Sequence, residues 1–167
     1  TNTRAMLILA DGVQIDLVHD LPEVVEQKRA IIRGENGKLL YEVKRDSLLN
    51  DETVEETFNR VVTYVGGDYF LTLSDGTRVW LNADSELEFP VSFVRNERVV
   101  KLQGEAYFEV QRDVNKPFIV DANGLRTRVL GTSFNVKAYR DEQNVFTTLV
   151  KGSVAVEVLD NGNVPTS

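Results

Sequence analysis

The chain has 167 residues, of which 42% are hydrophobic and 27% are charged, and its 26 acidic against 19 basic side chains give a net charge of −7. These values predict one globular domain with its own core and disfavour a nucleic-acid-binding role, because neutralisation of phosphate supplies most of the affinity for nucleic acids. The absence of cysteine excludes disulfides, thiolate metal sites and cysteine nucleophiles.

The first predicted element is a β-hairpin over residues 5–17. Apolar residues alternate on both sides of the pair Asp11-Gly12, which is typical of a tight turn between two strands. A three-residue loop that ends on Gly12 places six apolar residues on one face: Ala5, Leu7, Leu9, Val13, Ile15 and Leu17. We therefore expect a hairpin with one continuous apolar face.

The segment that follows, residues 20–57, is less regular. Residues 22–28 fit either a short helical turn, with Pro22 at its first position, or a loop. Two apolar runs, residues 30–32 and 39–43, flank Glu35-Asn36-Gly37 and predict a second strand–turn–strand unit. The polar, acidic stretch 47–57 is interpreted as a connector and as the main internal boundary of the chain.

Residues 69–81 repeat the pattern of the first hairpin. A three-residue loop, Ser74-Asp75-Gly76, with Gly76 in the left-handed region, sets Leu71 opposite Val79 and keeps one face apolar. A two-residue loop would instead set Leu73 against Arg78 and mix the two faces, so the longer loop is favoured. Two copies are too few for a repeat array, and an internal repeat and simple convergence both remain open.

Short strands are expected throughout the rest of the chain, after a first one at residues 58–65. They cover residues 91–94, 98–102, 106–110, 118–120, 126–130, 134–139, 145–150 and 154–158. Gln103-Gly104 predicts a bulge and Gly131 a break between strands. The tail, residues 161–167, is typical of a linker to a missing C-terminal module. Thr1 is not an initiator methionine, so we expect a fragment of a longer protein.

This pattern predicts an all-β, antiparallel-rich fold. A two-sheet sandwich and a twisted, β-solenoid-like stack of hairpins both fit it. We expect a single domain over residues 1–160, made of an N-terminal hairpin segment (1–57) and a core (58–160). No apolar run approaches the ~18 residues that are needed to span a bilayer.

Candidate catalytic residues are few. His19 is the sole histidine, so a Ser-His-Asp arrangement or an imidazole metal site lacks partners, and a surface position is favoured. Glu105 and Glu109 share one strand face, but a rise of ~3.3 Å per residue puts them about 13 Å apart, beyond the spacing of glycosidase carboxylates. We interpret both as an ordinary polar face, and we expect no catalytic residue, metal site or cofactor.

Two other features invite a binding role. Asp84, Glu86 and Glu88 alternate along one strand, where they suggest a charged, solvated sheet edge more than a calcium site, because a strand does not wrap a cation. Trp80 lies on the hairpin face opposite Leu71. We favour the interpretation that this second face of the hairpin is also buried over the alternative that Trp80 is an exposed binding platform.

Five stretches carry a family resemblance. In order along residues 66–158 they read GGDYFLTLSDGTRVWLNADSELEFPVSF, VKLQGEAYFEV, KPFIV, VLGTSFNVKAY and TTLVKGSVAV. Together they resemble the FecR-type periplasmic domain of anti-sigma factors, in the form common in Bacteroidetes. A departure lies at residues 63–67, TYVGG, where relatives usually have a Thr-Pro-Arg-Gly-Gly-like run, so this chain lacks the proline and the arginine of that run.

The resemblance implies a periplasmic sensor portion of a single-pass inner-membrane regulator. Such a protein holds an extracytoplasmic-function sigma factor through a cytoplasmic segment, which this chain lacks. It receives its signal from the signalling domain of a TonB-dependent outer-membrane transducer, and site-specific proteases then free the sigma factor for transcription of glycan or iron-chelate uptake genes. The family supplies no catalytic residues. It suggests Leu130, Phe134 and Val136 as core. The alternative is a carbohydrate-binding β module, which Trp80 and the tyrosines suggest.

Overall fold

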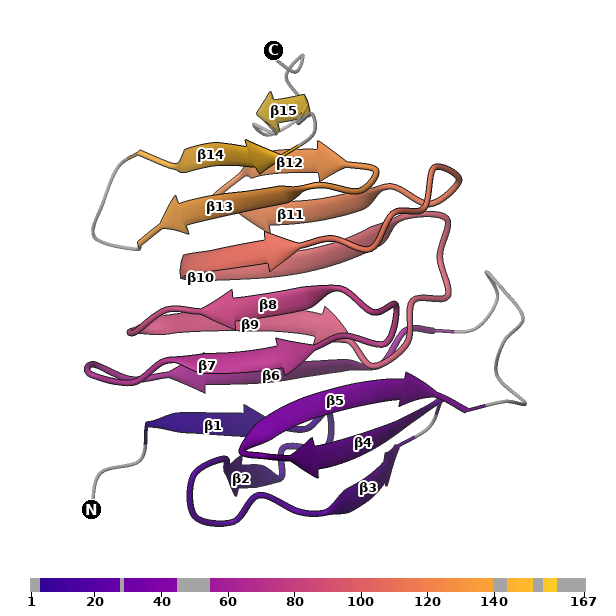
Figure 1. Ribbon diagram of the computed structural model, residues 1–167, viewed down its shortest axis with the longest axis vertical. Coiled ribbons are helices and arrows are strands. Elements are labelled where there is room, and N and C mark those ends of the chain that lie inside the picture. The colour runs from indigo at the N-terminus through magenta and orange to yellow at the C-terminus, as the bar shows by residue number, and fades with distance from the viewer. Residues whose placement is uncertain (1–3, 28, 45–54, 140–143, 152–154, 159–167) are drawn as a thin grey trace.

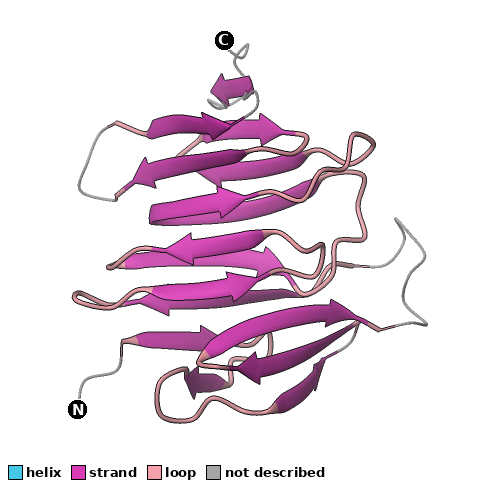
Figure 2. Cartoon of the chain, viewed as in Figure 1, coloured by secondary structure: helices cyan, strands magenta, loops and turns pink. Residues whose placement is uncertain are grey.

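Strands are the regular elements of the protein. The computed structural model describes residues 4–27, 29–44, 55–139, 144–151 and 155–158. Every regular secondary-structure element in these ranges is a β-strand (Figure 2). The strands form a curled mixed sheet and are stacked across the long axis of the molecule in two rows (Figure 1). The all-β prediction is confirmed.

The two rows are two halves of one hydrogen-bonded sheet. In the rear half of Figure 1 the order is β2 (Gln14–Asp16), β1 (Ala5–Ile8), β6 (Phe58–Thr63), β9 (Ser85–Pro90), β10 (Arg98–Glu109), β11 (Phe118–Ala122), β12 (Leu125–Val129) and β15 (Ala155–Val158). In the front half it is β3 (Val24–Gln27), β4 (Ala30–Glu35), β5 (Lys38–Val43), β7 (Tyr69–Thr72), β8 (Arg78–Leu81), β10, β13 (Ser133–Ala138) and β14 (Phe146–Lys151). Most pairs are antiparallel; β5–β7 and β10–β11 are parallel.

Strand β10 belongs to both halves and changes from one to the other at Gly104. Its first part pairs with β9 and β11 and its second part with β8 and β13. Gly104 has φ +100°, and the Ser85 side chain occupies the space that a Cβ would need. The predicted bulge is therefore wrong: the glycine bends a continuous strand, because a residue with a side chain fits neither the backbone angle nor the contact.

A single apolar core joins the two halves. Edge-to-face or tilted ring pairs connect them, Tyr41 with Phe89 at 5.1 Å and Phe108 with Phe118 at 6.0 Å between centroids. Phe134 and Val136 are fully buried, as expected. Leu130 is 40% exposed, so its assignment to the core was wrong, because it continues the alternation of β12 and shares the outward side with the exposed Arg128.

Both predicted Asp-Gly hairpins have the expected register. Leu71 lies opposite Val79, with Gly76 at φ +91°, and Leu7 lies opposite Ile15, with Gly12 at φ +92°. Between β4 and β5 the turn is only Asn36-Gly37, both at positive φ. The apolar faces of the two hairpins differ in how deeply they are buried. Val79 is fully buried, whereas Val13 is 49% exposed beside its turn.

Two local predictions were wrong. Residues 24–27 form β3, neither a helical turn nor a loop, because the β-branched pair Val24-Val25 has β4 to pair with. Residues 91–94 are buried without forming a strand, since Val91 N–H donates to the Thr57 carbonyl and Val94 N–H to Glu56 Oε2. Most of the predicted connector and the linker 161–167 lie outside the described residues.

Candidate functional site

A buried ion pair ties the β7–β8 turn to the start of β10. Arg98 is 1% exposed, and its Nη1 lies 2.7 Å from Asp75 Oδ2. The guanidinium also donates to the carbonyls of Lys116 (2.7 Å), Gln111 (2.8 Å) and Leu130 (3.3 Å). The sequence assigned Asp75 to turn formation alone and gave no signal for Arg98. Each nitrogen of the guanidinium has a partner within the protein, which makes this a structural feature rather than a reactive one.

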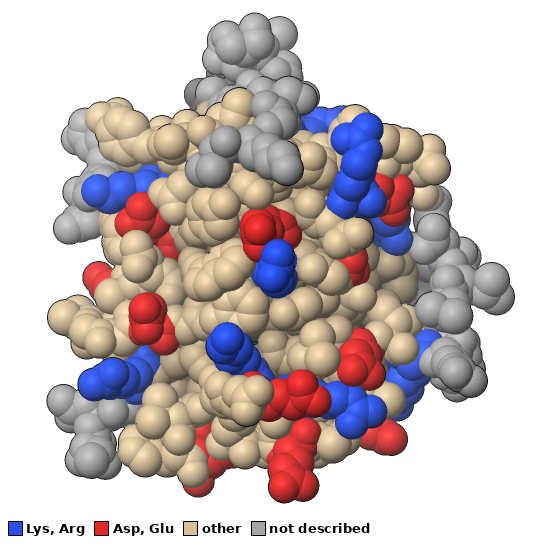
Figure 3. Space-filling view, viewed as in Figure 1, with Lys and Arg blue, Asp and Glu red and all other residues tan. Residues whose placement is uncertain are grey.

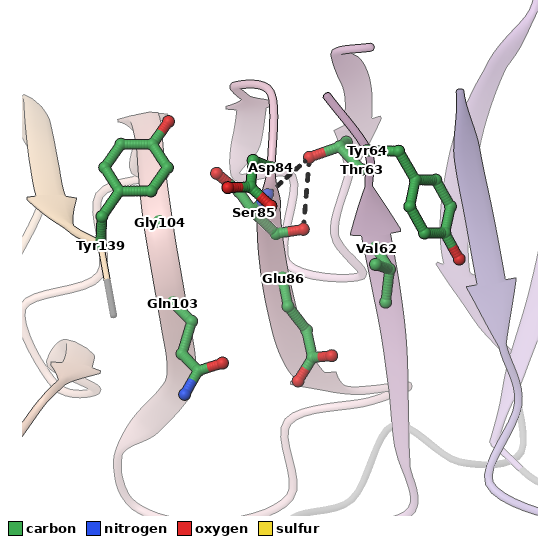
Figure 4. Close-up of a pocket in the computed structure, with 9 residues that line it drawn as sticks. All are labelled: Val62, Thr63, Tyr64, Asp84, Ser85, Glu86, Gln103, Gly104 and Tyr139. Carbon is green, nitrogen blue, oxygen red and sulfur yellow. Dashed lines mark hydrogen bonds between the residues drawn. The ribbon is translucent and has the colours of Figure 1, made fainter. Parts of the chain in front are cut away.

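A cleft of about 470 Å³ opens on the rear half, across β6, β9 and β10. In Figure 4, Tyr64 and Tyr139 stand at its two sides, with Glu86 and Gln103 between them. The Thr63 hydroxyl in its wall donates to the Asn82 carbonyl (2.5 Å), lies 3.2 Å from the Ser85 carbonyl and accepts from the Ser85 N–H (3.0 Å). These groups offer hydrogen bonds and aromatic contact, but no nucleophile beside an activating base.

The acidic series does not form a sheet edge. Strand β9 lies between β6 and β10, so Glu86 and Glu88 project from the middle of the rear half. Glu86 pairs with Arg60 at 3.4 Å, and Asp84 takes φ +53° in the turn before the strand. The prediction of an edge was wrong, because sequence alternation shows which side chains share a face but not which strands lie beside it.

The outward face of the front half carries three aromatic rings in one register row, here named the aromatic row: Phe70, Trp80 and Tyr107. Their centroids are 4.7 Å and 5.4 Å apart. Trp80 is 39% exposed, so the favoured expectation of a second buried face was wrong. The signal in the sequence is that Arg78 and Asn82 alternate with Trp80 on the same face, and polar residues at such spacing indicate a side that faces solvent.

Polar contacts flank the aromatic row on both sides. Glu105 accepts hydrogen bonds from Asn82 Nδ2 (3.0 Å) and Asn135 Nδ2 (2.8 Å). On the other side Arg78 and Glu109 form an ion pair at 2.8 Å. Separate partners hold the two glutamates, which agrees with a polar face. Figure 3 shows charges of both signs scattered over this side, with uncharged areas between them.

The remaining candidates are surface features. The His19 ring bonds Asp16 at 3.0 Å in an exposed turn. Within the described ranges, no three His, Cys, Asp or Glu side chains are grouped to hold a metal ion. Those ranges also contain no helix that is long and apolar enough to cross a membrane.

Comparisons with known proteins agree with the motifs. The model of the FecR family, "FecR protein", matches residues 59–155. Two crystal structures of candidate anti-sigma factors from Parabacteroides distasonis ATCC 8503 are similar at 32% identity, with TM-scores of 0.51 and 0.50. The matches cover 62% and 60% of this chain but only 61% and 60% of the solved ones. No curated protein matches the chain. On the family match, which covers more than half of its residues, the chain belongs to the FecR family.

Proposed function

We propose that the chain is the periplasmic sensor portion of a single-pass inner-membrane anti-sigma factor. It relays a signal from the signalling domain of a TonB-dependent outer-membrane transducer to an extracytoplasmic-function sigma factor, and so controls genes for glycan or iron-chelate uptake. The sigma factor is held by a cytoplasmic segment outside this chain, and site-specific proteases release it.

The observation that carries this proposal is the family match over residues 59–155. The similar structures, which are themselves described as candidate anti-sigma factors, support a regulatory role. The surface chemistry agrees with a module that binds proteins. Aromatic rings and an arginine, Phe70, Trp80, Tyr107 and Arg78, lie together on one outward face, and such residues are enriched where proteins bind one another.

Calorimetry tests direct sensing. The chain, alone and with its native C-terminal continuation, is titrated with the purified signalling domain of its cognate transducer. We expect saturable binding with a Kd on the order of 1 μM for at least one of the two proteins. The signalling domain of an unrelated transducer is the control and should not bind.

Absence of heat with both proteins would reject the direct contact. The regulatory role has its own readout, which is transcription from a sigma-dependent reporter in cells that carry the full-length protein with residues 59–155 deleted. Reporter output should stop responding to the inducer. An unchanged response would reject the sensor role itself.

A further inference from the structure

A small pocket opens at one end of the aromatic row, where the β4–β5 turn approaches β7 and β8. Its volume is about 280 Å³, and its lining includes Lys38, Asp68, Phe70, Trp80 and Asn82. Pockets for drug-sized ligands begin at about 300 Å³, so this one suits a smaller ligand. The role proposed above does not require it.

The apolar wall of the pocket is aromatic and rigid. Phe70 and Trp80 lie directly opposite each other on β7 and β8, and their rings are 4.7 Å apart at an angle of 60°. Lys38 Nζ lies over the Phe70 ring, 4.9 Å from its centroid, in a cation–π contact. Part of Trp80 remains open to solvent, which offers a flat apolar surface to a ligand.

The other lining groups are polar and of mixed charge. Asp68 is exposed and supplies a carboxylate, which accepts hydrogen bonds only. Asn82 donates one N–H to Glu105, a contact that fixes its amide plane, and its carbonyl oxygen is an acceptor. Lys38 supplies a donor. One carboxylate and one ammonium group leave the lining without net charge, which disfavours an anionic or a cationic ligand.

We propose that this pocket binds one ring of a neutral pyranose sugar, either free or at the end of a glycan. A pyranose presents an apolar C–H face, which stacks on the indole of Trp80, and hydroxyl groups at its edge, which hydrogen-bond to Asp68, Asn82 and Lys38. A purely apolar ligand would leave these polar groups desolvated without partners.

Trp80 is the only tryptophan in the chain, so the fluorescence and the indole resonance both come from a residue that lines this pocket, and substitutions locate the bound sugar. Neutral hexoses and N-acetylhexosamines are titrated into the protein while the Trp80 fluorescence and the indole N–H resonance are followed. We expect at least one sugar to give a saturable change with a Kd on the order of 1 mM. The titration needs no transducer, so its outcome is independent of the calorimetry proposed above.

Substitutions then locate the site. Asp68→Asn keeps the shape of an exposed side chain but removes its charge, and it should weaken binding about tenfold, the value of one charge-assisted hydrogen bond. Asp20→Asn, an exposed aspartate with the same charge change, is the matched control and should bind like the wild type.

Three outcomes would overturn the proposal. No sugar produces a saturable change at concentrations about fifty times the expected Kd. Asp68→Asn binds as tightly as the wild type. Tyr64→Ala, which alters the rear cleft and not this pocket, abolishes binding and so moves the site to the cleft.

Discussion

The β1–β2 and β7–β8 hairpins have the same turn but different surroundings. Both have a three-residue loop that ends on a glycine with φ near +90°. Asp11 bonds only its own turn, at Val13 N–H, and stays exposed. Asp75 bonds Thr77 in the same way and also pairs with the buried Arg98.

The first hairpin is held instead by hydrogen bonds between uncharged groups around Asn59, here named the neutral anchor. Ala10 N–H, at the first position of the turn, donates to Asn59 Oδ1 at 3.1 Å, and Asn59 Nδ2 donates to the Tyr41 hydroxyl at 2.8 Å. Asn59 is fully buried. The comparison teaches that a local sequence sets the shape of a turn, whereas partners far along the chain decide how much the turn contributes to stability.

The largest expected effect is at Arg98. Arg98→Met should lower the free energy of unfolding by about 3–5 kcal/mol, because it leaves the carboxylate of Asp75 buried without its partner. Urea denaturation measures the change. Arg78→Met is the matched control: its ion pair with Glu109 is largely exposed, and the loss should stay below about 1 kcal/mol. Equal losses for the two variants would contradict the importance of burial.

The next largest difference is expected when the aspartate of each turn is replaced by the uncharged asparagine. Asp75→Asn retains an oxygen for Thr77 N–H but not the charge facing Arg98, and should cost about 2–3 kcal/mol. Asp11→Asn should cost less than about 0.5 kcal/mol, as is usual for exposed positions. Urea midpoints of both variants test this. If Asp11→Asn were the more damaging change, the comparison would be reversed.

The two glycines should behave alike. Gly12→Ala and Gly76→Ala each force a side chain into the left-handed region and should cost about 1–2 kcal/mol. A Cβ at Gly12 meets no atom of the structure within 4 Å, and one at Gly76 meets Gln111 at an ordinary 3.5 Å, so packing adds little. A difference greater than about 0.5 kcal/mol between their thermal or urea unfolding energies would show that the turns are not locally equivalent.

The smallest expected effect is a pH dependence of the neutral anchor. Burial raises the pKa of Tyr41 far above its usual value of 10.0, so Tyr41 stays protonated in the folded protein while the unfolded chain ionises. Stability is then fully present below pH 10 and falls as the pH rises, by about 0.8 kcal/mol between pH 9 and 10.5 for this group.

Urea denaturation across that pH range, on the wild type and on Tyr41→Phe, measures this contribution. The variant should lose less stability with rising pH, with a remaining slope from Tyr69, whose pKa burial also raises. Parallel pH profiles for the two proteins would mean that Tyr41 is not the titrating group.

Prediction from the sequence succeeded where structure is local. Alternation and the Asp-Gly pairs gave both hairpins with their register, because the side-chain period of a strand and the positive φ of a glycine act over a few residues. The order of the family motifs identified the FecR family. Prediction failed at Val24-Val25, Leu130 and Trp80, where the outcome depends on which strand lies beside the segment and on what covers it.

By itself, then, the sequence determined the all-β class, the two turns and the family. Only the tertiary structure decided that β10 crosses between the two halves at Gly104, that Asp75 meets Arg98, and that Trp80 lines an open pocket. The physical reason is that each of these depends on contacts between residues 19 or more positions apart or on the absence of a covering element, and alternation within one segment specifies neither.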